Sequence, residues 1–327
     1  MFINSKNNNG HFSDLLIKNY IFVDMQKYIL IIFLLAIAIL PSRYAYGTQS
    51  KSVNAQDKGT ILMPSLPNTL INPKERANYL AVHFWDNFNP DDKSLINNEN
   101  VTEQSFVNLI SIFGIADMDS VQAGYKHLMK SAAPYADMLQ YILSLGEKYF
   151  YEKESPYHDD KTFSHFLNGA DFTRLDEPHR YYWERLLKLS SKNNIGTKAS
   201  NFEWVNSDNT RDSLFQISKD YILLLFVDPD CDDCTKLKKE ISQAALPTNC
   251  QIIAIYPGDD KELWEKDVKT ANPNWINGYD DKSKVMDNDI YDLKKFPVIY
   301  LLDADKNVIL KDTTFDAIKD FFNKPHW

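Results

Sequence analysis

The chain has 327 residues, of which 44% are hydrophobic and 25% charged, so it is long enough for two domains and can bury sizeable cores. It contains only 10 glycines and 14 prolines, which excludes fibrous and low-complexity classes. The net charge is −9 and there is no block of Lys and Arg, which excludes a nucleic-acid-binding footprint, and three cysteines are too few for a disulfide scaffold.

The residue pattern at the N-terminus predicts an export signal. Residues 29–40 read ILIIFLLAIAIL, an uncharged run too short for a membrane span, which needs about 20 residues. A basic residue precedes the run, and Ala45 and Gly47 follow it as the small residues of a cleavage site. We therefore predict a signal peptide at residues 1–47 and export to the periplasm or cell envelope, where a disulfide can persist.

Two alternatives at this end stay open. Met25 is a second candidate start, in which case the residues before it are a mis-assigned extension. An uncleaved membrane anchor is the alternative to cleavage.

Residues 48–71 are polar and contain Pro64 and Pro67, which predicts a flexible lead-in.

From residue 72 the apolar residues recur at helical spacing. Asn72-Pro73 is typical of a helix N-cap followed by proline at the first helical position. About six stretches show this period, and no alternating pattern interrupts them. We therefore predict an all-α domain over residues 72–190. The polar stretch Ser190–Ser200, with Gly196, predicts the domain boundary.

The pattern then changes to short, continuous apolar runs. Tyr221–Val227 and Gln251–Tyr256 are typical of strands buried on both faces. A mixed sheet covered by helices follows from this order of elements. The other expected elements are helices from about Leu237 to Ala245, over Lys261–Thr270, Lys282–Leu293 and Phe315–Phe322, and a hairpin of Val298–Leu302 with Val308–Leu310.

Cys231-Asp232-Asp233-Cys234 follows the first of these strands and opens a predicted helix. A helix N-terminus carries unsatisfied N–H groups and a partial positive charge, which stabilise a thiolate, the nucleophile of disulfide exchange. The spacing covers one helical turn, so the second sulfur can attack a mixed disulfide formed by the first. We expect Cys231 to attack and Cys234, one turn deeper, to resolve.

Residues 197–327 resemble the thioredoxin fold in its TlpA/ResA-like envelope branch, through Phe226–Cys234 and Phe296-Pro297-Val298-Ile299-Tyr300. The resemblance implies an α/β thioredoxin-like domain after the all-α domain. It also implies that Pro297 lies in a cis-proline loop beside Cys231 and that the backbone of Phe296 pairs with an extended substrate peptide. The helical region resembles, more weakly, a domain of unknown function that precedes thioredoxin-like domains in bacterial envelope proteins.

The motif departs from the family pattern at three positions. Asp230 stands where the family usually has Trp or another aromatic residue just before the first cysteine. Leu225 and Leu237 stand where relatives carry proton-handling carboxylates.

Carboxylates instead crowd the two cysteines. They oppose a thiolate by like-charge repulsion, and nearby lysines offset part of this effect. We therefore expect the pKa of Cys231 to be closer to that of a free thiol than to the acidic DsbA thiol, which favours a reductant or isomerase over a strong oxidant. The acids are Asp228, Asp230, Asp232 and Asp233, and the lysines are Lys236, Lys238 and Lys239.

The cysteines and acids allow other interpretations. The pair could be a structural disulfide in an inactive binding module, or half of a zinc site, although no second CxxC or His pair occurs at suitable spacing. Cys250 begins an apolar strand and predicts a buried, inert thiol rather than a redox partner. His158-Asp159-Asp160, with His165, predicts a solvated loop, and Asp303–Asn307 predicts a hairpin turn rather than a calcium loop. We expect no metal.

The sequence thus supports two hypotheses of function. The first is an exported thiol-disulfide oxidoreductase acting on protein thiols and disulfides of the envelope, with no dissociable cofactor. The family resemblance implies a membrane electron donor, because a reductant outside the cytosol must be re-reduced. The second is a non-catalytic binding or scaffold protein, in which the helical region carries recognition and the thioredoxin-like domain is an inert platform.

Overall fold

The computed structural model describes residues 61–324. The predicted signal peptide at residues 1–47 and the first part of the predicted lead-in lie outside this range. None of the helices formed by residues 61–324 is both long and apolar enough to cross a membrane.

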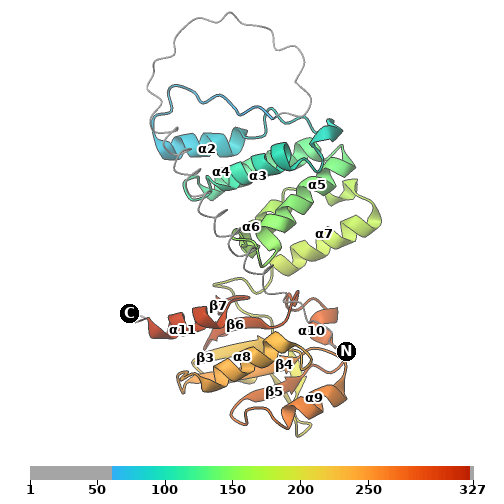
Figure 1. The fold of residues 1–327 in the computed structure, drawn as a ribbon, viewed down its shortest axis with the longest axis vertical. Helices are drawn as coiled ribbons and strands as arrows, with labels where there is room; N and C mark the ends of the chain where they lie inside the picture. The colour runs from blue at the N-terminus through green and yellow to red at the C-terminus, as the bar shows by residue number, and fades with distance from the viewer. Residues whose placement is uncertain (1–60, 325–327) are drawn as a thin grey trace, which may run out of the picture. The chain divides into compact units, whose positions relative to one another are not determined.

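The part of the described chain before residue 197 is helical, as the sequence predicts (Figure 1). Its first α-helix begins where expected, because the Asn72 side chain accepts a hydrogen bond of 2.8 Å from the Lys74 N–H and Pro73 occupies the first turn. The elements are α2 (Pro73–His83), η1 (Lys93–Leu95), η2 (Glu99–Glu103), α3 (Gln104–Ile110), α4 (Met118–Ala132), α5 (Ala136–Gly146), η3 (Glu147–Tyr151), α6 (Asp160–Leu167), η4 (Phe172–Arg174) and α7 (Glu177–Ser190).

Helices α2 and α4 pack at very short range because of one glycine. A Cβ atom at Gly124 would lie 2.0 Å from the carbonyl oxygen of Ala81, so only glycine fits at this crossing. The apolar faces around the contact are fully buried, among them Leu80, Ala81, Tyr125 and Leu128.

The chain divides into two compact units, and their boundary does not coincide with the change from helices to strands. One unit runs to Leu145 and includes Gly169–Asp171, and the other comprises Gly146–Asn168 and the residues from Phe172 onward. The second unit, called the sheet unit below, therefore contains η3, α6 and α7 as well as the sheet. The domain limits derived from the sequence stay a prediction.

The sheet unit is built on a mixed seven-stranded sheet in the order β2-β1-β5-β4-β3-β6-β7. β3 runs parallel to β4 and antiparallel to β6, and the predicted hairpin is formed by β6 and β7. The elements are β1 (Glu203–Val205), β2 (Arg211–Ser213), η5 (Leu214–Gln216), β3 (Tyr221–Phe226), α8 (Asp232–Gln243), β4 (Cys250–Tyr256), α9 (Lys261–Val268), β5 (Ile276–Tyr279), α10 (Lys284–Asp287), β6 (Val298–Asp303), β7 (Val308–Leu310) and α11 (Phe315–Asn323).

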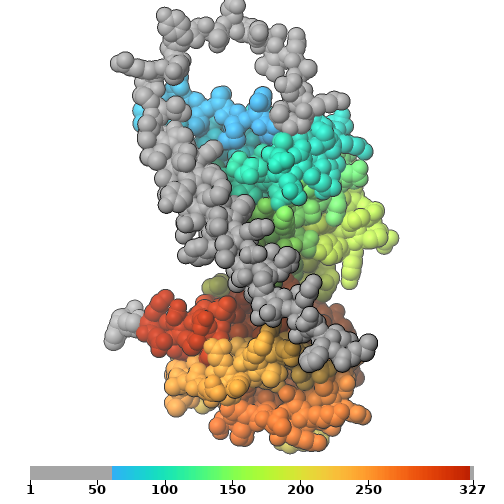
Figure 2. Space-filling view, viewed as in Figure 1, coloured from blue at the N-terminus to red at the C-terminus, as the bar shows by residue number. Residues whose placement is uncertain are grey.

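Alternate residues of the central strands build two cores. On one face Leu223, Leu225 and Ile299 pack against the apolar sides of α8 and α11, whose atoms lie on the visible side of the sheet unit in Figure 2. On the other face Leu224 and Tyr300 pack with residues around α10. Burial on both faces explains why these strands read as continuous apolar runs.

One predicted helix is wrong, and three strands were not predicted. Lys282–Leu293 forms only the single turn α10, because Lys282, Ser283 and Asp289 adopt positive φ angles of 73°, 49° and 51°, which a helix does not allow. The missed strands β1, β2 and β5 have three or four residues each and no apolar run.

Candidate functional site

The two cysteines of the motif lie at the start of α8, just after the connection from β3. β3 ends at Phe226, and Cys231 is the N-cap of α8, whose first residue is Asp232. The structure joins Cys231 and Cys234 in a disulfide with their Cα atoms 5.2 Å apart. Cys231 is half-buried and Cys234 is fully buried, so the sulfur of Cys231 is the one that a second protein can reach.

The backbone at the start of α8 is directed at the sulfur of Cys231. The Cys234 N–H lies 3.1 Å from this sulfur and donates to it, so the Cys231 side chain caps the helix. When the disulfide is reduced, the same N–H and the helix N-terminus stabilise a Cys231 thiolate. The geometry thus supplies the charge stabilisation that an attacking thiol needs.

The loop that faces the pair contains a cis peptide bond between Phe296 and Pro297. The register of the sheet explains why this loop lies beside the cysteine pair, because Phe226, the last residue of β3, pairs with Val298, the first residue of β6. The chain after β3 and the chain before β6 therefore leave the sheet at the same edge. The Sγ atom of Cys231 lies 3.7 Å from the carbonyl oxygen of Phe296.

The acids of the motif are only partly neutralised. Asp233 forms an ion pair of 3.0 Å with Lys236, which lowers the pKa of Asp233 through a hydrogen bond. Lys238, expected to offset the motif, instead pairs with Asp267 of α9 at 2.7 Å. The other three acids, Asp228, Asp230 and Asp232, have no ion pair within residues 61–324.

The protein around the pair is apolar. Leu225 and Leu237, where the family resemblance implied carboxylates, are buried in the core that contains Cys234 and that contacts Cys231. The sulfur chemistry is therefore set by the helix N-terminus and the acids at the surface. Within the described range no cluster of three or more His, Cys, Asp or Glu could hold a metal ion.

A groove of about 530 Å³ lies beside the motif and is called the redox groove below. Pro297 and the motif residue Asp233 both line it, so it is continuous with the surroundings of the pair. Part of its lining comes from the loop between η3 and α6, which lies far before the sheet in the sequence. The lining residues are Lys153, Glu154, His158, Asp233, Lys236, Leu237, Glu240, Pro297, Ile299, Asp312, Thr313, Thr314, Phe315 and Asp316.

Sequence reasoning missed a buried ionic cluster next to this groove, called the Asp160 cluster below. Asp160, expected in a solvated loop, is 8% exposed and pairs with Lys311 at 3.0 Å and with Lys294 at 3.6 Å. Burial alone would raise the pKa of Asp160, but the two lysines outweigh it and the pKa is lowered. Tyr151 donates to Asp292 at 2.8 Å, and Asp292 lies 3.4 Å from Lys294.

The third cysteine lies at the other end of the sheet. Cys250 is the first residue of β4 and pairs with Tyr221, the first residue of β3, whereas the motif follows the end of β3. Cys250 is free, and burial raises the pKa of its thiol to about 11. It is therefore protonated at neutral pH, in keeping with the expected inert thiol.

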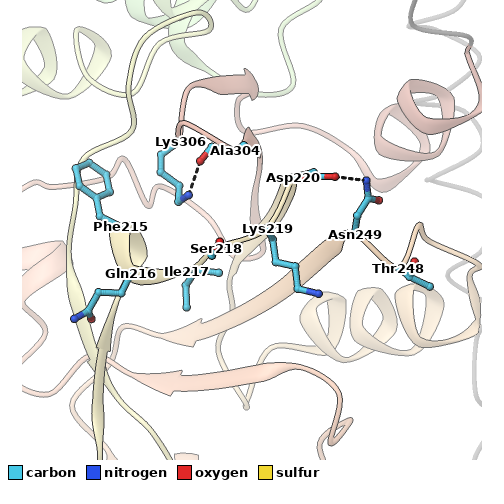
Figure 3. Close-up of a pocket in the computed structure, with 10 residues that line it drawn as sticks. All are labelled: Phe215, Gln216, Ile217, Ser218, Lys219, Asp220, Thr248, Asn249, Ala304 and Lys306. Carbon is cyan, nitrogen blue, oxygen red and sulfur yellow. Dashed lines mark hydrogen bonds between the residues drawn. The ribbon is translucent and has the colours of Figure 1, made fainter.

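A second hollow, of about 560 Å³, opens near the beginnings of β3 and β4 (Figure 3). Asp220 accepts a 2.8 Å hydrogen bond from Asn249 there, and Lys306 donates to the carbonyl of Ala304 at 2.6 Å. No cysteine lines this hollow, and it lies at the strand ends opposite to the Cys231–Cys234 pair. It has no part in the chemistry of the pair.

Comparison with known proteins gives matches to both parts of the chain. Residues 43–193 match DUF5106, a domain of unknown function. A thioredoxin-like protein from Bacteroides caccae is 31% identical, with a TM-score of 0.68 over 80% of this chain and 97% of that protein.

Two further solved structures cover only 40% of this chain. The C-terminal domain of an uncharacterized protein from Bacteroides fragilis is 28% identical, matched over 99% of its length with a TM-score of 0.40. The thioredoxin domain of a thiol-disulfide oxidoreductase from Bacteroides vulgatus is 20% identical, also over 99% of its length, with a TM-score of 0.36. No curated protein matches the chain. Since the similarity to the Bacteroides caccae protein extends over nearly all of that protein, the chain belongs to the thioredoxin-like proteins, with a DUF5106 region before its thioredoxin-like part.

Proposed function

We propose that the protein is an exported thiol-disulfide oxidoreductase that reduces or isomerises disulfides of envelope proteins. The observation that carries this proposal is the position of the Cys231 sulfur. It is half-exposed, accepts from the Cys234 N–H at 3.1 Å and lies 3.7 Å from the Phe296 carbonyl of the cis-proline loop.

The reaction consists of two exchanges that start from the reduced pair. The Cys231 thiolate attacks a substrate disulfide, which forms a mixed disulfide and releases one substrate thiolate. The Cys234 thiolate then attacks the Cys231 sulfur, which forms the disulfide seen in the structure and releases the second substrate thiolate. Two electrons pass to the substrate, and a dithiol donor at the membrane returns them to the pair.

The charges at the motif favour the reducing direction. Asp228, Asp230 and Asp232 have no ion pair within residues 61–324 and oppose a thiolate at Cys231. A less stabilised thiolate makes the reduced pair less favourable, so electrons leave it more readily. The backbone of Phe296 and the ring of Pro297 position the substrate next to the sulfur.

Trapping of mixed disulfides tests this proposal. The Cys234→Ala variant lacks the resolving thiol, so it should accumulate mixed disulfides with substrate proteins. Cys231→Ser should accumulate none, because Cys234 is buried. A reduced wild-type protein that fails to reduce insulin, together with a Cys234→Ala variant that traps nothing, would refute the proposal.

A second candidate function is a scaffold with an inert thioredoxin-like platform. Leu225 and Leu237 favour it, because they leave the buried side of the pair without a group that accepts a proton. In this case the disulfide is structural. Its reduction lowers the stability of the protein and does not produce a dithiol that reacts with substrate disulfides. A redox titration separates the two, since a structural disulfide has a potential below about −300 mV.

A further inference from the structure

The loop between η3 and α6 is fixed at both ends to the segments that flank the β6–β7 hairpin. At its start, Tyr151 donates to Asp292, and the Lys294 ammonium donates to the Tyr151 carbonyl at 3.0 Å and lies 3.1 Å from its ring centroid. At its end, Asp160 pairs with Lys294 and Lys311. Lys294 lies two residues before Phe296, so the same contacts connect the loop to the cis-proline segment.

Between these two ends the loop forms a wall of the redox groove. Lys153, Glu154 and His158 line the groove together with residues of α8 and of the start of α11. Lys153 is held by an ion pair with Asp312, and Glu154 pairs with Lys295 at 3.1 Å. The apolar part of the lining consists of Leu237, Pro297, Ile299 and Phe315. The groove thus has an apolar surface with charged rims, which suits an extended polypeptide segment.

The charge around the groove is negative. Among the lining residues acids outnumber lysines, because Lys153 and Lys236 face Glu154, Asp233, Glu240, Asp312 and Asp316. Two further lysines lie beside the lining: Lys295 pairs with Glu154, and Lys319 is shared between Glu240 and Asp316, so five acids of the lining face four lysines. The three motif acids without an ion pair add to this field at the end where the sulfur lies. Such a field attracts cations and repels acidic chains.

We propose that the Tyr151–Asp160 loop, which lies in the DUF5106 region, is a substrate-recognition element, and that the redox groove takes a cysteine-containing segment with basic flanking residues. This inference rests on the proposed function and gives it a substrate class. Glu154 is a specificity-determining residue in this arrangement, because it lines the groove and is 72% exposed in its side chain. The preference acts on encounter and binding and leaves the sulfur chemistry unchanged.

Single-turnover kinetics with two matched peptides test the inference. The peptides each contain one disulfide, flanked by lysines in one and by glutamates in the other. The reduced protein is freed of reductant and mixed with each peptide, and thiol release gives a second-order rate constant. Each constant is divided by that of dithiothreitol with the same peptide, which removes the effect of the flanking charges on the intrinsic reactivity of the disulfide.

We expect the normalised rate constant of the basic peptide to exceed that of the acidic peptide by about tenfold at low salt and to approach it at about 1 M salt. Glu154→Lys should lower this ratio about two- to fivefold, and Glu154→Gln by about half as much on a logarithmic scale. Glu265→Lys is the matched control. It changes the net charge equally at an exposed, ion-paired glutamate of α9 outside the groove, and it should leave the ratio close to that of the wild type.

Two results would overturn the inference without touching the proposed function. One is a ratio near one for the wild type. The other is an equal fall of the ratio in Glu154→Lys and Glu265→Lys, which would assign the preference to net charge alone. Failure of the proposed function has a different signature, namely no thiol release from either peptide.

Discussion

Replacement of Asp160 by Asn tests whether the Asp160 cluster holds the η3–α6 loop against the sheet. The carboxylate is 8% exposed and interacts with two ammonium groups, Lys311 at 3.0 Å and Lys294 at 3.6 Å. Asparagine preserves the size and shape of the side chain but removes its charge. The two lysines then lose a buried counter-ion, and the substitution leaves no cavity.

The expected cost follows from what each lysine retains. Removal of one partner of a buried ion pair typically costs about 3–5 kcal/mol. Lys311 keeps hydrogen bonds to the Lys192 carbonyl and to Asn194, both at 2.9 Å, and Lys294 keeps Asp292 at 3.4 Å. We therefore expect a smaller loss than this typical range, about 2–3 kcal/mol in the free energy of unfolding.

Urea unfolding of the full chain, followed by tryptophan fluorescence, measures this loss. Asp316→Asn is the control, because its carboxylate is 83% exposed and pairs with Lys319 at the surface, where an ion pair is worth about 0–1 kcal/mol. Asp160→Asn should shift the midpoint far more than the control. Equal shifts in the two variants would refute the reasoning that Asp160 is buried and indispensable to its lysines.

The difference in stability between the wild type and Asp160→Asn should depend on pH. The pKa of Asp160 is lowered in the folded protein, so ionised Asp160 contributes stability at pH values above its ordinary value of 3.8. This contribution is lost as the pH falls through the folded pKa. The difference in stability between wild type and Asp160→Asn should therefore be full at neutral pH and shrink below about pH 4. A difference that grows on acidification would contradict this assignment.

Three further predictions concern packing, the third thiol and the motif acids. Gly124→Ala should destabilise the protein by about 2–3 kcal/mol in thermal or urea unfolding, because its Cβ would meet a backbone carbonyl of α2, whereas Gly114→Ala, with nothing within 4 Å, should be neutral or slightly stabilising. Cys250 should resist iodoacetamide at pH 7 and react faster as the pH approaches about 11; rapid labelling at pH 7 would argue against its burial. Asp232→Asn should speed the alkylation of reduced Cys231 about two- to threefold at pH 7, and an unchanged rate would show that this acid does not act on the thiol.

The core of the site could be read from local sequence. The apolar run Tyr221–Val227 specified a buried strand, and the CxxC that follows it had to lie at a helix N-terminus. The family resemblance placed Phe296 and Pro297 in a cis-proline loop, and the structure has both the cis bond and its proximity to Cys231. The strand and the helix start depend on contiguous residues, so local pattern was sufficient for them, whereas the cis-proline loop was expected only from the family resemblance.

Short or irregular elements could not be predicted from local sequence. β5 reads Ile-Asn-Gly-Tyr, and its glycine is required because a Cβ at Gly278 would lie 2.5 Å from the Trp204 ring. That reason exists only once β1 and β5 are side by side. The expected helix over Lys282–Leu293 is absent for a similar reason. Its apolar residues Val285 and Tyr291 pack in the sheet core from the short turn α10 and the segment after it, and positive φ angles interrupt the helix on both sides of α10.

The amino-acid sequence by itself determined that helices precede a sheet and that the cysteine pair lies at the start of a helix, because both follow from periodicity and spacing within a few residues. Only the tertiary structure decided that Asp160 is buried between two lysines and that Lys153, Glu154 and His158 line the groove beside the pair. Those residues lie more than 70 positions before Cys231 in the chain. Their role depends on long-range contacts, which no local pattern of charge or hydrophobicity records.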